Sequence, residues 1–162
     1  MVVDRLCAQH GLGPMRSKFK GEYARGQVAG REVVLLKPLT YMNLSGESVQ
    51  AAMTFFKVST AEVLVVHDEL DLPFGKLKLK VGGGTAGHNG LKSLQAHCGG
   101  PGFSRIRIGI GRPRSGSVDR HVLSDFSAEE SAELENVLQS ATAAVEDVLD
   151  HGMKVAMNRH NG

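Results

Sequence analysis

The sequence predicts an α/β fold: one domain with a mixed, mostly parallel β-sheet and helices on both faces. Segments of strand character alternate with segments of helical periodicity, which is the pattern of helices packed on a sheet. The run 62–67 (EVLVVH) is largely apolar, as is typical of a strand covered on both faces in a parallel sheet. A length of 162 residues indicates a single domain over 1–162.

The first third of the chain is predicted to contain two helices and a hairpin. Apolar spacing indicates a helix over 2–10, and alternation indicates strands over 23–28 and 33–36 joined by a tight turn at Ala29-Gly30. Ser45 is the expected N-cap of the second helix. The apolar positions of that helix share one face: Val49, Ala52, Met53 and Phe56.

The rest of the chain is predicted to contain two charged strands and two further helices. Segments 76–81 (KLKLKV) and 105–110 (RIRIGI) alternate cations with aliphatic residues, so in one sheet they would place five cations on one side. A glycine-rich loop at 82–87 leads into a helix over 89–97. Ser127 and Glu130 form a capping box for the last helix, which ends at Gly152.

Composition excludes several classes of protein. No apolar run approaches the roughly 18 residues of a membrane span, and no signal peptide is evident. The two cysteines, Cys7 and Cys98, have no metal-ligand or redox spacing, and they suit a reducing compartment. We therefore expect a cytoplasmic protein.

Charge is strongly polarised along the chain. Between Lys76 and Arg114 there are eight lysines and arginines and no acid, whereas 119–150 carries nine acids and one arginine. Such a distribution favours contact between the middle of the chain and a polyanion. The alternative is that both segments are ordinary solvated faces, and a protein-interaction role for the acidic helix rests on charge alone.

Several familiar sites are disfavoured. Leu91 separates Gly90 from Lys92, so the glycine-rich loop lacks the Walker pattern, and the Rossmann spacing also fails. His67 and His88 lack a third ligand at a telling spacing, so no metal is expected. Ser45 lacks the context of a nucleophilic serine.

Three polar side chains are candidates for chemistry. Asp68 ends the buried run, where a carboxylate could orient a base, although it could equally be a capping loop acid. Asn43 and Asn89 each precede or open a helix and could be N-caps. Beside Asp68 they would instead suit recognition of an amide or ester carbonyl. Tyr41 and Met42 could line an apolar wall.

Four linked motifs carry a resemblance to a known family. They are 41–46 (YMNLSG), 67–75 (HDELDLPFG), 82–93 (GGGTAGHNGLKS) and 105–113 (RIRIGIGRP). In this order and spacing the chain resembles bacterial peptidyl-tRNA hydrolases over essentially its whole length. The resemblance implies a monomeric α/β domain, without cofactor, metal or membrane partner. Its reaction would be hydrolysis of the ester between a peptide and the 3′ end of tRNA, and its partner the acceptor stem and 3′ end of peptidyl-tRNA.

The resemblance also implies residue roles. Asp68 would orient and polarise a catalytic histidine, while Asn43 and Asn89 would hold the peptide and the attacking water. Three further residues would line the same cleft: Tyr41, Met42 and His88. The tRNA phosphates would be received by Lys78, Lys80 and Arg107, with Arg105 as a weaker addition.

One departure from the family concerns the N-terminus. The family begins with a strand, a Gly-Leu-Gly-Asn-Pro-Gly turn and a Thr-Arg-His-Asn stretch that carries the general base, and none of the seven histidines here stands in that context. We therefore expect Met1 to be a mis-assigned start or a truncation. The alternative is a catalytically inactive RNA-binding protein on the same scaffold.

Overall fold

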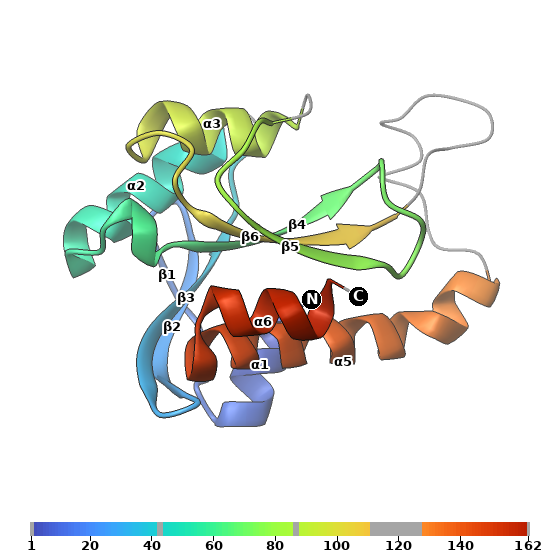
Figure 1. Cartoon of the computed structure of the whole chain (residues 1–162). Helices are drawn as coiled ribbons and strands as arrows, with labels where there is room; N and C mark the ends of the chain where they lie inside the picture. Colours follow the sequence, from blue (N-terminus) through green and yellow to red (C-terminus); the bar gives the residue numbers. More distant parts are fainter. Residues whose placement is uncertain (1, 42–43, 86–87, 111–127, 162) are drawn as a thin grey trace. The chain divides into compact units, whose positions relative to one another are not determined.

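The computed structural model describes residues 2–41, 44–85, 88–110 and 128–161, apart from the side chains of 128–132 (Figure 1). The chain divides into two compact units. One consists mainly of residues 3–65 and 81–104, and the other of 66–80 and 105–162. Helices and strands alternate along the chain, so the predicted α/β class is confirmed. A single domain over 1–162 stays a prediction.

Three antiparallel strands form the sheet of the first unit: β1 (Arg16–Lys18), β2 (Gly21–Val28) and β3 (Arg31–Pro38). The predicted turn joins β2 to β3, with Ala29 and Gly30 at φ of 53° and 76°. Two successive positive φ values define the hairpin turn whose twist matches its strands. The hairpin is therefore confirmed, and β1 is an addition that the sequence did not predict.

Helix α1 (Val2–His10) is tied to this sheet. Lys37 on β3 forms an ion pair with Asp4 at 2.9 Å. A Cβ on Gly26 would overlap the side chain of Leu12, just after the helix. The predicted helix over 2–10 is therefore confirmed, and the absence of a side chain at position 26 allows the chain to pass close to the strand.

Helices α2 (Ser45–Phe56) and α3 (Asn89–His97) pack together in the same unit. Their shared core consists of buried or partly buried apolar side chains: Leu91, Leu94, Cys98, Phe103, Val49, Met53, Val63 and Val65. The predicted N-cap at Ser45 is wrong, because Leu44 occupies that position and no side chain caps the helix. The backbone N–H of Gly46 instead donates to Ser93 Oγ at 2.7 Å.

A second sheet has the strand order β4-β6-β5, so the strands do not form the one sheet that we expected. Strand β4 spans Leu64–Glu69 and β6 spans Ser104–Gly109. They run parallel, because Ser104 N–H donates to the Val63 carbonyl and Ile110 N–H to the Glu69 carbonyl. The predicted strand 62–67 lies two residues too early, since Glu62 belongs to the 3-10 turn η2 (Thr60–Glu62).

Strand β5 (Leu77–Val81) pairs antiparallel with β6. Gly109 N–H donates to the carbonyl of Lys76 at 2.8 Å, and Gly82 N–H donates to the carbonyl of Phe103 at 3.1 Å. The sheet is therefore mixed, with one parallel and one antiparallel pairing rather than mostly parallel pairing. Because the strands form two separate sheets rather than one, β5 lies at an edge of its sheet.

Helices α5 (Ala128–His151) and α6 (Met153–His160) follow in the second unit. Gly152 separates them at φ 88°, as predicted, whereas the proposed cap at Ser127 lies outside the described residues. Asn161 closes the free edge of β5: its amide accepts from Leu79 N–H at 2.6 Å and donates to the Leu79 carbonyl at 3.0 Å.

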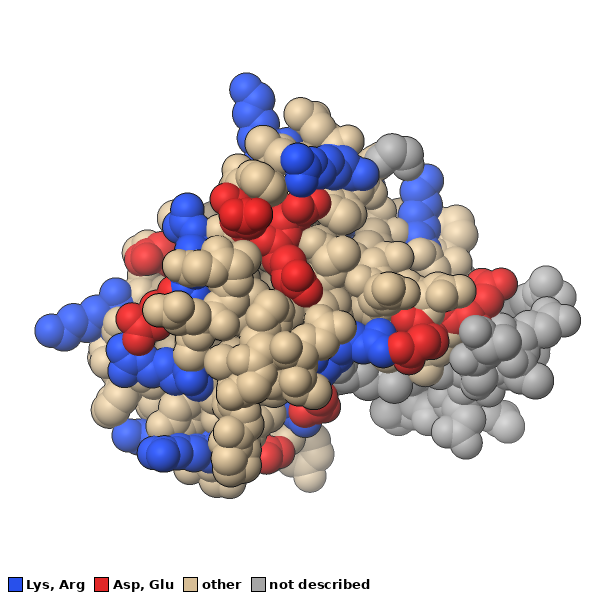
Figure 2. Space-filling model, turned by 90° about the horizontal axis from the view of Figure 1, so that it is seen from below, with Lys and Arg blue, Asp and Glu red and all other residues tan. Residues whose placement is uncertain are grey.

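Charge on this protein is mixed over the face viewed in Figure 2, where acidic and basic side chains are interspersed. Among the described helices, none has both the length and the apolar character that a membrane crossing requires.

Candidate functional site

Two neighbouring strands present cations on one face of the second sheet. The register of β5 against β6 sets Lys78 opposite Arg107 and Lys80 opposite Arg105. Paired residues in a sheet point to the same side, so the predicted alternation holds on both strands. Leu79 and Ile106, at 1% and 0% exposed, occupy the other face. Lys78 and Lys80 are both exposed.

Arg105 lies on the predicted side of the sheet with the other cations, but it is not a surface residue. Only 2% of this residue is exposed, and burial lowers the pKa of its guanidinium, with a further contribution from nearby Arg107. A buried guanidinium cannot present its donors to a phosphate on the sheet surface. Arg105 is therefore not a surface cation. Alternation along the strand predicts the face on which Arg105 lies, but it does not predict that this part of the face is covered.

Arg107 is held by an acid that sequence reasoning missed. Its Nη2 donates to Glu69 Oε1 at 2.6 Å, and the two side chains are 20% and 10% exposed. Glu69 is the last residue of β4 and adjoins the singled-out Asp68. The only signal for Glu69 in the sequence is that adjacency, because the pairing depends on the register of β4 against β6.

Asp68 lies inside β4 rather than just beyond a strand. Successive side chains of a strand point to opposite faces, so Asp68 lies on the face opposite Glu69 and its partner Arg107. Its backbone carbonyl is 2.8 Å from Nδ1 of His67. The Asp68 carboxylate and the cation row therefore lie on opposite faces of this sheet.

Asn89 is not the N-cap of α3, which was one of the roles considered for it. His88 is the N-cap instead, and its Nδ1 accepts from Leu91 N–H at 3.2 Å. Asn89 is exposed, and its side chain makes no hydrogen bond to the described part of the chain. Its carboxamide is available as both donor and acceptor.

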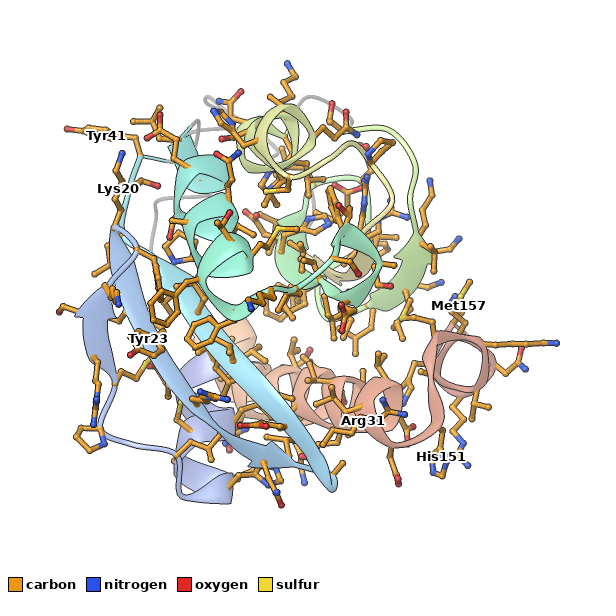
Figure 3. The ribbon with its side chains drawn as sticks, turned by 90° about the vertical axis from the view of Figure 1, so that its left-hand side faces the viewer. Lys20, Tyr23, Arg31, Tyr41, His151 and Met157 are labelled. Carbon is orange, nitrogen blue, oxygen red and sulfur yellow. The ribbon has the colours of Figure 1, made fainter. Side chains whose placement is uncertain are left out.

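Tyr41 stands at an open pocket of about 460 Å³. The residue is 83% exposed, and Leu39 and Leu44 beside it are 62% and 36% exposed. An ion pair of 2.8 Å between Lys20 and Glu47 lies in the same lining, and Figure 3 shows Tyr41 pointing outward close to Lys20. Met42 and Asn43, which we also singled out, lie outside the described residues.

Metal ligation finds no support in the part of the chain that the structure describes, where no group of three histidine, cysteine or acidic residues could hold an ion. The polar groups of the candidate site are instead carboxylates, carboxamides and the cationic side chains of lysine and arginine. A row of cations on a sheet receives polyanions. The fold and site thus define an α/β protein with a cation-bearing sheet face.

Comparisons with known proteins agree with that class. The family model "Peptidyl-tRNA hydrolase" matches residues 1–162. The peptidyl-tRNA hydrolase of Sorangium cellulosum is 51% identical, over 99% of this chain and 74% of the relative. That of Geobacter sulfurreducens is 45% identical, over 99% of this chain and 83% of the relative.

A solved structure shows the same fold. The crystal structure of peptidyl-tRNA hydrolase from Acinetobacter baumannii matches with a TM-score of 0.91 and 37% identity, over 99% of this chain and 83% of the other. The chain therefore belongs to the peptidyl-tRNA hydrolase family.

Proposed function

We propose that this chain hydrolyses peptidyl-tRNA by cleaving the ester between the peptide and the 3′ end of the tRNA. The observation that carries the proposal is the cation row on β5 and β6, beside the strand that holds Asp68. Membership of the family over the whole chain, with relatives named for this substrate, supports the reaction.

Binding of the tRNA is assigned to the cation row. Lys78 and Lys80 are exposed on β5, and Arg107 keeps further N–H donors beyond the one given to Glu69. Contacts of lysine and arginine with phosphate are charge-assisted and release counterions. These three side chains would hold the sugar-phosphate backbone near the acceptor end.

The chemical step is ester hydrolysis by water. A general base takes a proton from the water as its oxygen attacks the ester carbonyl carbon, and the C–O bond to the ribose then breaks. The products are a peptide carboxylate and a tRNA with a free hydroxyl at its 3′ end. We assign no residue of this sequence as the base itself. Asp68 is assigned the orientation of that base, and Asn89 and Asn43 the positioning of the peptide and the water.

The peptide part of the substrate suits the pocket beside Tyr41. Its walls combine the apolar side chains of Leu39 and Leu44 with the polar pair Lys20 and Glu47. Such a mixture accepts apolar side chains while hydrogen bonding to a peptide backbone. We assign Met42 to the same wall and His88 to the cleft, where its ring also fixes the start of α3.

We place this activity in a cytoplasmic monomer. Cys7 and Cys98 are both buried free thiols, which suits a reducing compartment. Light scattering of the purified protein measures the oligomeric state directly, and a dimer would contradict this assignment.

Asp68→Asn tests the proposed reaction. The variant should lower the turnover of N-acetylaminoacyl-tRNA by about 10²–10⁴-fold, which is the usual contribution of general-base catalysis. Its affinity for deacylated tRNA should not change, because the cation row is intact. Asp71→Asn, at an exposed carboxylate three residues away, is the matched control. Unchanged turnover in Asp68→Asn would overturn the assignment.

A further inference from the structure

Four aromatic residues of the first unit gather at one surface that the hydrolytic site does not use. Tyr23 on β2 meets Phe56 on α2 with ring centroids 5.8 Å apart. Phe19, in the turn between β1 and β2, lies 5.4 Å from Phe55 and 5.6 Å from Phe56. Figure 3 shows Tyr23 on the side of the sheet where α2 ends. We call these four side chains and the cations around them the Phe55 surface.

Phe55 is the exposed centre of this surface. It contacts Phe56 edge-on at 4.9 Å, yet 57% of the residue remains exposed. An aromatic ring so exposed is unusual for a core position, since burying a phenylalanine removes a large apolar area from water and stabilises a fold. Much of that stabilisation is unrealised here, and a partner could still supply it.

Cations surround the aromatic rings. The ammonium of Lys18 lies 3.8 Å from the centroid of Phe55, and the guanidinium carbon of Arg25 lies 5.6 Å from that of Phe56. Arg16 pairs with Tyr23 in the sheet register, so both point to the same face. Lys57 follows Phe56 directly as the residue that ends α2.

Acids do not balance these cations. Glu32 pairs with Arg25 at 2.9 Å. Arg16, Lys18 and Lys57 have no carboxylate partner in the described part of the chain. Glu22, the one acid of β2, alternates to the other face of the sheet. The Phe55 surface therefore carries a net positive charge and attracts an anion.

Backbone conformation singles out the same surface. Four non-glycine residues among those described have positive φ, and two of them belong here: Phe19 at 58° and Lys57 at 56°. Left-handed backbone favours glycine or asparagine. Large aromatic and cationic side chains are thus kept at positions where smaller residues would cost less, which points to a use for them.

We infer that the Phe55 surface is a second RNA-binding surface, which takes unpaired nucleotides. An exposed aromatic ring offers a face on which a base stacks, and neighbouring lysines and arginines follow the phosphates. An acidic protein would be attracted by the same charge but would gain little from the ring. The inference does not depend on hydrolysis or on the cation row of β5 and β6.

Phe55→Leu and Lys18→Gln test this inference in the full chain. The probe is a short fluorescent single-stranded RNA, with binding followed by anisotropy across a salt series. Phe55→Leu keeps apolar bulk but removes the stacking face, so affinity should fall about tenfold. Lys18→Gln should weaken binding and reduce the slope of log K against log salt by about 0.7.

The controls separate this surface from the hydrolytic site. Lys154→Gln, at an exposed lysine of α6, should leave RNA affinity unchanged. Phe55→Leu should leave the turnover of N-acetylaminoacyl-tRNA at saturating substrate unchanged. Lys78→Gln should still bind the single-stranded probe, and adding Phe55→Leu to that variant should weaken its binding. Equal RNA affinity of Phe55→Leu and the parent would overturn the inference. So would competition by polyglutamate that is as effective as competition by unlabelled RNA.

Discussion

Arg107 and Glu69 form a partly buried ion pair, with Nη2 donating to Oε1 at 2.6 Å. Glu69 lies at the end of β4 and Arg107 within β6, so the carboxylate joins two adjacent strands and fixes the direction of the guanidinium. A planar fork can serve a carboxylate and a phosphate at once, whereas an ammonium is a single point charge. The pair thus presents an oriented donor set beside the lysines of β5.

Arg107→Lys tests whether that orientation matters. Lysine keeps the charge but cannot serve Glu69 and a phosphate with the same geometry, so tRNA affinity should fall about tenfold, the value of one charge-assisted hydrogen bond. Lys78→Arg is the control and should bind tRNA as well as the parent. Equal affinities of Arg107→Lys and the parent, measured by filter binding at fixed salt, would contradict this assignment.

Lys78→Gln and Lys80→Gln test the cation row itself. Each variant should reduce the dependence of log K on log salt by about 0.7–0.9, because each lysine neutralises one phosphate. The measurement is tRNA binding between low and moderate salt. Lys154→Gln on α6 is matched in charge and exposure and should keep the parent slope. A parent slope in both β5 variants would show that tRNA binds elsewhere.

Asn161→Ala should destabilise the protein by about 1–3 kcal/mol, the cost of leaving buried polar groups unpaired. The variant removes both hydrogen bonds to Leu79 on edge strand β5. Urea unfolding measures the change in free energy. Asn158→Ala, at an exposed residue of α6, is the control and should leave the free energy of unfolding unchanged. A neutral Asn161→Ala would mean that water replaces the amide without loss.

Gly46→Ala should destabilise the protein by about 1–3 kcal/mol through overpacking. A Cβ at this position would overlap the backbone carbonyl of Ser93, so the two helices would have to separate. Thermal unfolding provides the measurement. Gly84→Ala, where a Cβ would meet nothing within 4 Å, should leave the melting temperature unchanged. Parent stability in Gly46→Ala would contradict the close contact between α2 and α3.

The lowered pKa of Asp147 predicts that the stability of the fold depends on this carboxyl in acid. Its hydrogen bond to His160 at 2.7 Å, followed by the influence of Arg159, holds the pKa of the carboxyl below its ordinary value of 3.8. A lowered pKa in the folded state stabilises the fold above pH 3.8, and this stabilisation is lost as the pH falls through the folded value. Asp147→Asn should remove that part of the pH dependence of urea unfolding.

Asp150→Asn is the matched control for this effect. Asp150 lies on the same helix with 58% of its side chain exposed, and its replacement should preserve the steep loss of stability below pH 3.8. If Asp147→Asn keeps the same acid limb as the parent, the bond between α5 and α6 does not contribute to the pH dependence.

Elements with a clear period could be predicted from the sequence. The helix over 89–97 and the hairpin turn at Ala29-Gly30 are found as expected, because local conformational preference and apolar spacing suffice there. The start of α2 was predicted one residue too late, because serine is a common N-cap. In the structure Leu44 is the N-cap, and its N–H donates to the Tyr41 carbonyl.

Candidate site residues show the same division. Lys78 and Lys80 could be assigned to an exposed face from alternation alone, and the structure confirms that exposure. Arg105 has the same alternation but is buried. Periodicity states which side of a strand a residue occupies, and it carries no information on what covers that side.

The order of residues therefore determined most strands, most helices and the side of its strand on which each cation lies, because these depend on neighbours close along the chain. The linked motifs also indicated the family. Only the tertiary structure decided that Glu69 meets Arg107, 38 positions apart, and that Phe19 meets Phe55. Contacts of this kind depend on strand register and helix packing, which are set by burial of the whole core rather than by any local pattern.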